Sequence, residues 1–263
     1  MSQRDARANA AFVPLSCEGC RNPALLPFEF TMAFQPILDV SNGRPVAYEA
    51  LVRGVQGESA ATILSKVDDG SRYRFDQACR VRAIELASRL GLTQIPDCKL
   101  SINFLPNAVY RPASCIKATI EATERFGLPH DRLIFEVTEG ERVRDSEHLK
   151  GIFEEYRRQG MMTAIDDFGA GYAGLNLLAQ FQPHIIKMDM ELTRGIATDP
   201  VRQAIAEAVN LACTKLGIQI IAEGIETQHE ADFLTSLGIT WQQGYLYAKP
   251  EIEALPLFDR LAA

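Results

Sequence analysis

The heptapeptide TAIDDFG at residues 163–169 ends an apolar run with two adjacent carboxylates, Asp166 and Asp167. Two like charges about 4 Å apart repel each other by roughly 4 kcal/mol at an effective dielectric constant of about 20. Adjacent acids are therefore usually found on loops in water. A pair placed at the end of an apolar strand needs either solvent or a cation close by.

Other apolar runs of the chain also end in a polar side chain. One acid at such a place is most simply explained as a helix cap or a solvated group. Seven successive runs that end alike are not expected if surface residues are placed independently. In chain order the end residues are Glu49, Asn103, Glu136, Asp166 with Asp167, Lys187, Glu223 and Gln243.

This set contains five carboxylates and a single ammonium group, so Lys187 alone cannot offset the repulsion. Divalent cations can. All-oxygen donors with no histidine among them favour a hard ion such as Mg²⁺ or Mn²⁺ over zinc. One carboxylate of Asp166-Asp167 can bridge two ions while its neighbour binds the second. Two ions roughly 3.5–4 Å apart are suited to in-line displacement at phosphorus.

The elements that must position these residues follow from the hydrophobic pattern, which alternates short apolar runs with longer amphipathic stretches. It predicts eight strands, at residues 30–38, 45–52, 98–104, 132–139, 161–167, 184–190, 218–224 and 240–247. It predicts helices near residues 72–90, 112–126, 144–159, 172–181, 199–217, 226–237 and 252–262.

The helix at 199–217 has the strongest signals. Asp199 is its expected N-cap, Pro200 takes the first helical position and Gly217 ends it. An apolar face is formed by Val201, Ile205, Ala208 and Ala212.

The first two strands are joined through Asn42-Gly43, a hairpin signal, so they should be antiparallel. Strands linked through helices should be parallel, with right-handed crossovers. We therefore predict a (β/α)8 TIM-type barrel with the first strand antiparallel to the others and the usual first helix missing. An open doubly wound sheet is the alternative, but no Gly-rich phosphate fingerprint follows any strand. In a barrel the seven polar strand ends would meet at one face.

Residues 26–263 are expected to form this one domain, with residues 1–25 as an N-terminal arm that is partly disordered. The net charge of −7 disfavours a nucleic acid polymer as partner, and no apolar run is long enough to cross a membrane. Without an apolar signal segment the protein is expected in the cytoplasm with reduced thiols. The C-x-x-C pair Cys17 and Cys20 hints at metal or redox chemistry, but scattered thiols are the simpler interpretation.

Eight short motifs in order resemble the EAL family of bacterial cyclic di-GMP phosphodiesterases, from Gln35 to Pro250. The tripeptide that names the family is Glu49-Ala50-Leu51, inside YEALVRG. The others are QPI (35–37), SINF (101–104), EVTE (136–139), DDFGAGY (166–172), KMD (187–189), AEGIET (222–227) and QGYLYAKP (243–250).

The resemblance implies that one metal ion is bound by Glu49, Asn103, Glu136 and Asp166, and the second by Asp166, Asp167 and Glu223. Glu49, Lys187 and Glu223 would be catalytic: Lys187 would orient the attacking water, and Glu223 has also been regarded as general base. Substrate contacts are expected from Gln35, Leu51, Arg53, Asn103, Asp166, Gln243 and Pro250, with Arg53 on a phosphate. Glu139 would anchor the DFGAGY loop, and Asp189 would support Lys187.

The implied reaction is attack of water on one phosphodiester of cyclic di-GMP, leaving linear 5′-pGpG. The resemblance also implies a homodimer formed through the region after the fifth strand, while no regulatory protein partner is named by the sequence. The chain departs from common family patterns at Gly54, where many relatives have Trp, and at Ala170 and Ala173 of the DFGAGYAG loop.

The sequence is also compatible with two alternatives to the enzyme. A receptor that binds cyclic di-GMP without cleaving it would be expected to have lost metal ligands, whereas the ligand set here is intact. An unrelated barrel hydrolase, such as a two-carboxylate glycosidase, would not need Asp166-Asp167 together with Lys187 and Asn103.

Overall fold

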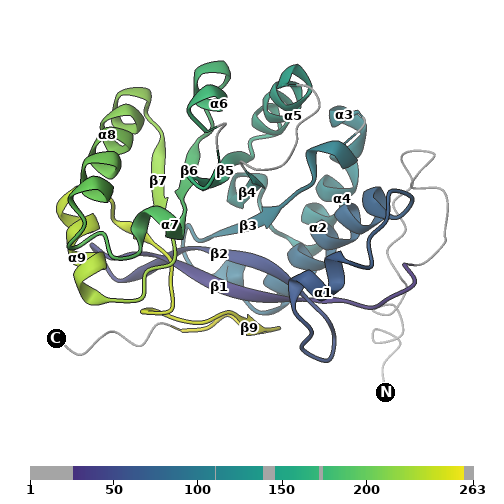
Figure 1. Cartoon of the computed structure of the whole chain (residues 1–263). Helices are drawn as coiled ribbons and strands as arrows, with labels where there is room; N and C mark the ends of the chain where they lie inside the picture. Colours follow the sequence, from purple (N-terminus) through teal and green to yellow (C-terminus); the bar gives the residue numbers. More distant parts are fainter. Residues whose placement is uncertain (1–25, 110, 139–145, 172–173, 258–263) are drawn as a thin grey trace.

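The structure is a computed structural model that describes residues 26–109, 111–138, 146–171 and 174–257. Its core is a closed sheet in the order β2-β3-β4-β5-β6-β7-β8-β1, completed by pairing of β1 with β2 (Figure 1). The strands are β1 (Thr31–Asp39), β2 (Arg44–Arg53), β3 (Lys99–Asn103), β4 (Leu133–Thr138), β5 (Met162–Phe168), β6 (Ile185–Met188), β7 (Gln219–Ala222) and β8 (Trp241–Gln242). The predicted barrel is confirmed.

The reversed first strand is also confirmed. β1 pairs antiparallel with both β2 and β8, whereas the other neighbouring strands of the barrel are parallel. The hairpin turns at Asn42-Gly43, where Gly43 has φ 67° and its N–H donates to the carbonyl of Asp39. Glycine adopts this left-handed conformation without the penalty that a Cβ would bring. The hairpin places Gln35 of β1 opposite Glu49 of β2.

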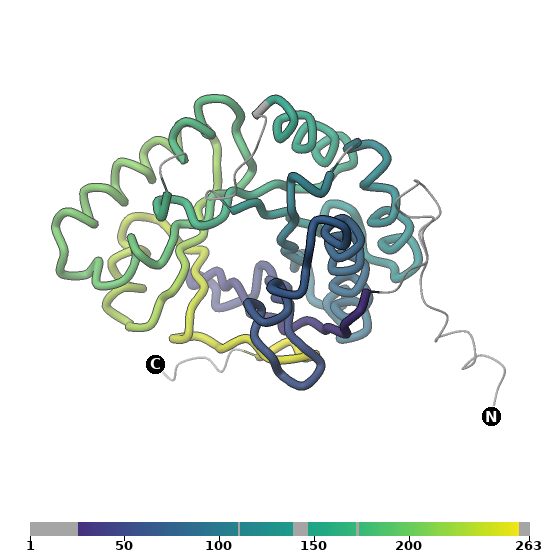
Figure 2. The backbone as a smooth tube through the Cα atoms, turned by 45° about the vertical axis from the view of Figure 1, so that its right-hand side comes forward, coloured from purple at the N-terminus to yellow at the C-terminus, as the bar shows by residue number. Residues whose placement is uncertain are grey.

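Helices surround the strands on the outside (Figure 2). They are α1 (Ala60–Leu64), α2 (Arg72–Arg89), α3 (Pro112–Cys115), α4 (Lys117–Phe126), α5 (Ser146–Arg158), α6 (Gly174–Gln180), α7 (Met190–Thr193), α8 (Pro200–Leu216) and α9 (Gln228–Ser236). Six predicted helices correspond to α2, α3 with α4, α5, α6, α8 and α9. The short helices α1 and α7 were not predicted. No helix within the described ranges is long and apolar enough to cross a membrane.

The predicted helix at 252–262 is wrong over its described part, residues 252–257, where the chain is not helical. A further strand, β9 (Glu251–Ile252), pairs instead with Ala33 and Phe34 of β1. The reason lies in β8, which is much shorter than the predicted 240–247 and pairs with β1 only at Leu38 and Asp39. The remaining edge of β1 has free backbone groups, and pairing with them outweighs local helix propensity.

The apolar face of α8 does not pack against the barrel. Val201 is 66% exposed and Ile205 40%, while Ala206 and Cys213 point inward and are buried. The predicted caps of this helix are nevertheless confirmed: Asp199 accepts from the N–H groups of Val201 and Arg202, and Gly217 ends the helix with φ 69°.

The barrel interior contains a layer of aliphatic residues beneath the polar strand ends. The layer consists of Ile37, Ala47, Ile134, Ala164, Ile185 and Ile221, all fully buried. Each lies two positions from a polar residue of the same strand or strand end, and so on the same inward face: Gln35, Glu49, Glu136, Asp166, Lys187 and Glu223. The alternation of β-strands therefore presents the polar set as the next layer up.

A buried cation fixes the outer side of β3 and β4. Arg80 of α2 is fully buried; its Nη2 lies 2.8 Å from Oδ2 of Asp76, and its Nη1 donates to the hydroxyl of Tyr156 at 2.7 Å. The guanidinium lies 5.1–5.7 Å from the ring centres of Phe104, Phe135 and Tyr156. The other carboxylate oxygen of Asp76 accepts from the N–H of Leu105, two residues after Asn103.

Replacing Arg80 should therefore be costly. Arg80→Met leaves Asp76 buried without its partner, and we expect the free energy of unfolding to fall by about 3–5 kcal/mol, measured by urea denaturation. The double variant Asp76→Leu/Arg80→Met should be less destabilised, since it removes both charges. The control is Arg158→Met, because Arg158 pairs with Glu155 while 66% exposed and should contribute less than about 1 kcal/mol. A similar small loss for Arg80→Met would contradict this role.

Candidate active site

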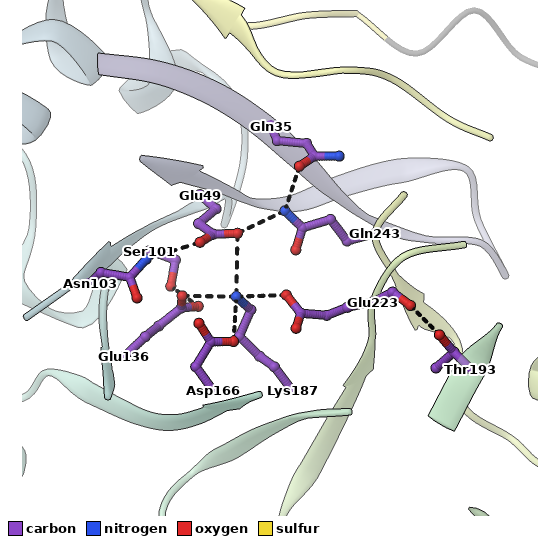
Figure 3. A network of polar contacts seen from close by, with 10 residues as sticks. All are labelled: Gln35, Glu49, Ser101, Asn103, Glu136, Asp166, Lys187, Thr193, Glu223 and Gln243. Atoms are coloured by element: carbon purple, nitrogen blue, oxygen red, sulfur yellow. Dashed lines mark hydrogen bonds and ion pairs between the residues drawn. The ribbon is translucent and has the colours of Figure 1, made fainter. Parts of the chain in front are cut away.

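The polar strand ends converge on one ammonium group. Nζ of Lys187 lies 2.8 Å from Glu223, 2.9 Å from Glu136, 3.0 Å from Asp166 and 3.3 Å from Glu49 (Figure 3). The lysine comes from β6 and the four carboxylates from the ends of β2, β4, β5 and β7. The predicted meeting of these side chains at one face of the barrel is thus what the structure shows.

Glu49 accepts hydrogen bonds from two side-chain amides, and one of these contacts a third amide. Its Oε1 accepts from Nδ2 of Asn103 at 3.0 Å, and its Oε2 accepts from Nε2 of Gln243 at 2.9 Å. The same Nε2 lies 3.3 Å from Oε1 of Gln35. The amide oxygen of Gln243 is buried and has no hydrogen-bond partner among the described residues. Such a buried acceptor suits a donor that the chain itself does not supply, for example a water molecule.

Ser101 is a site residue that the polar strand ends did not reveal. It lies on β3 two residues before Asn103, is fully buried, and its hydroxyl donates to Oε1 of Glu136. The other oxygen of Glu136 accepts from Lys187. Only the two-residue alternation of the strand could have indicated Ser101, because a serine inside an apolar strand carries no other signal.

The backbone conformation at Asp167 determines how the side chains of the Asp166-Asp167 pair are directed. The register of β5 against β6 shifts between Ile165 and Phe168, and Asp167 has φ 53°, which is uncommon for a residue with a Cβ. This left-handed residue lets both adjacent side chains reach the mouth, although a regular strand would send them to opposite faces. Strain of this kind is typical of functional sites.

Two overlapping groups of carboxylate oxygens result. Glu49, Glu136 and Asp166 form one group, and Asp166, Asp167 and Glu223 form the other, with the oxygens of each group within 4.8 Å of one another. Asp166 belongs to both, as expected of a bridging ligand. The ordinary donor chemistry of such all-oxygen clusters fits hard divalent cations.

The charge balance of the mouth is unfavourable for ionised acids. Burial, followed by repulsion from Glu49 and Asp166, raises the pKa of Glu136 to about 8 despite Lys187. Burial and then the neighbouring Asp166 raise the pKa of Asp167 to about 6.

Glu223 and Lys187 are shifted in the same direction for opposite reasons. Burial raises the pKa of Glu223 well above its usual range, against the attraction of Lys187. Burial lowers the pKa of Lys187, but the surrounding carboxylates, led by Asp166, outweigh it, so this pKa is raised well above its ordinary value. Without further cations, burial and repulsion between carboxylates thus favour the protonated forms of Glu136, Asp167 and Glu223.

The other predicted site residues that the structure describes lie on β2, directly before β9 and at the start of α7. Leu51 and Arg53 are among the last three residues of β2 and are partly exposed, and Nη1 of Arg53 donates to the carbonyl of Val52 at 2.7 Å. Pro250 directly precedes β9, and nearby Ala248 accepts from Nε2 of Gln35 at 3.1 Å. Asp189 is the N-cap of α7, where it accepts from the N–H of Glu191 at 2.7 Å, so support of Lys187 by Asp189 stays a prediction.

The predicted N-terminal arm at residues 1–25, which includes the Cys17/Cys20 pair, lies outside the described residues, as do Glu139 and Ala173. The unusual Gly54 can be explained. A Cβ there would lie 2.0 Å from Oε2 of Glu58, which accepts from the N–H of Gln56, while the N–H of Gly54 donates to the carbonyl of Glu58. Glu58 folds over the glycine, so a larger residue would require this loop to change.

Comparison with known proteins agrees with this geometry. A sequence model of the EAL domain matches residues 23–250. The chain belongs to the EAL domain family. It is 33% identical over 224 residues to the blue light- and temperature-regulated antirepressor BluF of Escherichia coli, covering 85% of this chain and 55% of BluF. It is 29% identical over 227 residues to the cyclic di-GMP phosphodiesterase PA2567 of Pseudomonas aeruginosa, covering 84% of this chain and 38% of that protein.

Solved EAL structures share the fold. A standalone versatile EAL protein from Vibrio cholerae O395, in its c-di-GMP bound form, has TM-score 0.86 and 50% identity, covering 90% of this chain and 98% of that one. BlrP1 of Klebsiella pneumoniae, as a manganese and cyclic di-GMP complex, has TM-score 0.81 and 36% identity, covering 89% and 58%. The chain spans about two fifths to a half of the length of three curated relatives. These are BluF, PA2567 and an Escherichia coli protein named "Probable cyclic di-GMP phosphodiesterase PdeD".

Removing the central ammonium group should expose the repulsion. We expect Lys187→Met, in EDTA at pH 8, to melt on the order of 10 °C below the wild type in calorimetry, as when one partner of a buried ion pair is lost. Added Mn²⁺ should raise the melting temperature of the variant more than that of the wild type, because the ion replaces the missing positive charge. Lys215→Met, an exposed lysine of α8, is the control. Equal melting temperatures of both variants in EDTA would refute this account.

Proposed function

We propose that this EAL domain hydrolyses cyclic di-GMP to linear 5′-pGpG with the help of two divalent cations, Mg²⁺ or Mn²⁺. The observation that carries this proposal is the pair of oxygen clusters that share Asp166 around Lys187. The manganese and calcium complexes of BlrP1 with cyclic di-GMP support the same ion type and ligand for this fold.

Each ion has its proposed protein ligands. Glu49, Asn103, Glu136 and Asp166 would hold the first, while Asp166, Asp167 and Glu223 would hold the second. In the structure Asn103 already donates to Glu49, so its amide oxygen is left available. When bound, the ions would lower the pKa of a water molecule and neutralise charge on the phosphate and the leaving oxygen.

The side chains around the clusters have distinct tasks. Lys187 would hold the attacking water through an N–H of its ammonium group, which the carboxylates keep protonated. Glu223 is the candidate to accept the proton of that water, because its oxygen lies 2.8 Å from the same ammonium group. Gln243 would hold a water or the substrate through its unpaired amide oxygen.

Substrate contacts are proposed along the hairpin side of the mouth. Arg53 at the end of β2 would bind a phosphate with its planar fork. Gln35, Leu51 and Pro250 would contact guanine and ribose, and β1, β2 and β9 bring them to the same side of the site. The barrel supplies a rigid frame for this set, as positioning of a phosphodiester requires.

A receptor that binds cyclic di-GMP without cleaving it is the second candidate. It is favoured by one finding: BluF, a relative with 33% identity, is named as an antirepressor. The converged set of Glu49, Glu136, Asp166 and Glu223 around Lys187 favours the enzyme, because binding alone would not require such a concentration of buried charge.

Turnover decides between the two. Purified protein with cyclic di-GMP and Mg²⁺ or Mn²⁺ should release pGpG, followed by chromatography, and EDTA should abolish the reaction. Glu49→Ala should lower kcat/KM by at least about 100-fold, since it removes a metal ligand, while circular dichroism shows the fold retained. Glu124→Ala, an exposed acid of α4, is the control. Saturable binding without product would support the receptor, and near-wild-type turnover of Glu49→Ala would refute the ligand assignment.

We also propose a homodimer in which a second copy covers the exposed apolar side chains of α6 and α8. Both helices lie on the same side of the barrel as neighbours (Figures 1 and 2). Leu175 of α6 is 70% exposed, and Leu211 of α8 is exposed on the helix that also carries Val201 and Ile205. Exposed apolar groups gathered on adjacent elements are typical of an interaction surface.

Charged substitutions in the proposed interface test for the dimer. Val201→Asp/Ile205→Lys should shift the protein from dimer to monomer in size-exclusion chromatography with light scattering, because these charges would have to be desolvated in the interface. The control is Leu257→Lys, since Leu257 is exposed but follows β9 on another part of the chain. A wild-type protein that is monomeric at tens of micromolar, or a double variant that remains dimeric, would contradict the proposal.

A further inference from the structure

The four-residue helix α7 is the element that contacts both loops bearing the second oxygen cluster. It begins directly after β6, and it lies between the end of β5, which bears Asp166 and Asp167, and the end of β7, which bears Glu223. Its side chains contact both. Sequence patterns gave no sign of it, because four residues are too few for a helical period.

The contact with the Glu223 side is a hydrogen bond. Thr193, the last residue of α7, is fully buried, and its hydroxyl donates to the main-chain carbonyl of Glu223 at 2.5 Å (Figure 3). This carbonyl belongs to the peptide that joins Glu223 to Gly224. The N–H of Glu223 donates to the carbonyl of Met188 at 3.0 Å, so the backbone of Glu223 is held on both sides.

Met190 of α7 packs closely against Gly224, the residue that follows Glu223. Gly224 has φ 66°, and a Cβ built on it would lie 2.4 Å from Cβ of Met190. Glycine therefore serves two purposes here: it accepts the left-handed backbone, and it lets α7 approach the peptide. With this peptide fixed, the direction of the Glu223 side chain towards Lys187 is largely set.

The contact with the Asp167 side is made by Leu192. Gly169, two residues after Asp167, has φ 101°, and a Cβ there would lie 2.3 Å from Cδ1 of Leu192. The N–H of Asp189, the N-cap of α7, donates to the carbonyl of Phe168 at 3.2 Å. One short helix thus adjoins both chain segments that carry the second cluster.

Hydrogen bonds and an ion pair also hold the residues that directly follow α7. The N–H of Gly195 donates to Oε1 of the buried Glu230 at 2.7 Å, and Oε2 of Glu230 accepts from the N–H groups of Glu226 and Thr227. Arg194 pairs with Glu226 at 2.5 Å. Residues 193–195 are therefore fastened at three points to the segment 223–230, which runs from Glu223 into α9. A hydroxyl held so firmly can fix the carbonyl to which it donates.

We propose that Thr193 is a positioning residue for Glu223, and through it for the second of the two cation sites. This inference rests on the proposed function, since it assumes that the second oxygen cluster holds an ion. Thr193 touches neither substrate nor ion; it orients the backbone of the residue that does. Supporting groups of this kind typically change metal affinity by 10–100-fold.

Manganese binding to the free protein tests the proposal without turnover. Wild-type protein should bind two Mn²⁺ ions in titrations followed by electron paramagnetic resonance. Thr193→Val keeps the shape but removes the hydroxyl, and it should retain one ion at near-wild-type affinity while binding the second at least about tenfold more weakly. Thr193→Ser keeps the hydroxyl and should restore the second ion.

Turnover gives an independent readout. At saturating Mn²⁺, Thr193→Val should lower kcat about 10- to 100-fold while KM for cyclic di-GMP changes less than about threefold, because the substrate contacts are elsewhere. The matched control is Thr123→Val: Thr123 of α4 is also buried, and its hydroxyl donates to the carbonyl of Ile120 at 2.7 Å. A merely structural threonine should lower the melting temperature in both variants alike and leave ion binding unchanged.

The possible outcomes separate this inference from the proposed function. Two ions bound with equal affinity by wild type and Thr193→Val would overturn the role of Thr193 and leave the proposed function standing. A wild-type protein that binds no pair of ions would overturn both. If Thr193→Val does not fold, Thr193→Ala measured at low temperature takes its place, and the same loss of the second ion is expected.

Discussion

The contact of one buried ammonium group with four carboxylates is the interaction on which the arrangement of the site depends. Lys187 is fully buried, and its charge is stabilised only because Glu49, Glu136, Asp166 and Glu223 arrive from four different strands. A closed barrel is what makes this convergence possible: the strands are far apart in sequence, yet each delivers its inward side chain to the same level. Isolated in a low-dielectric interior, any one of these charges would be strongly unfavourable.

The layers behind the site explain why the charges stay in register. Four isoleucines together with Ala47 and Ala164 fill the barrel directly beneath the carboxylates and so keep these at the mouth. On the outer side, Asp76 and Arg80 hold the turn after β3 through the N–H of Leu105. The positions of the carboxylates thus follow from packing on two sides. Hydrogen bonds from Asn103 and Gln243 to Glu49, and from Ser101 to Glu136, then orient these carboxylate groups.

The sequence was informative where a repeated pattern carries physical meaning. Strand alternation, the Asn42-Gly43 turn and the polar strand ends were sufficient to predict the barrel, its reversed first strand and the residues that meet Lys187. The failures share a cause as well. Residues 252–257 and the apolar face of α8 were interpreted from local periodicity, whereas their places are decided by the free edge of β1 and by an exposed surface. Ser101, Arg80 and Thr193 escaped notice because a buried hydroxyl or guanidinium in an ordinary apolar element is identifiable only from its partners in space.

The charge count of the mouth connects this geometry with the ions that we propose. Five carboxylates share the mouth with one ammonium group, and burial, together with repulsion from Glu49 and Asp166, raises the pKa of Glu136 to about 8 against the attraction of Lys187. Two divalent cations together with Lys187 would balance five ionised acids completely. The same carboxylates that now surround Nζ of Lys187 would hold the ions, and the N–H groups of Lys187 would then be available to a water molecule. Lys187 holds the acids together in this structure, and in the proposed mechanism it would orient the nucleophile. A phosphodiester would then bring negative charge into a site that is already neutral, and Arg53 is the residue that we propose to bind it.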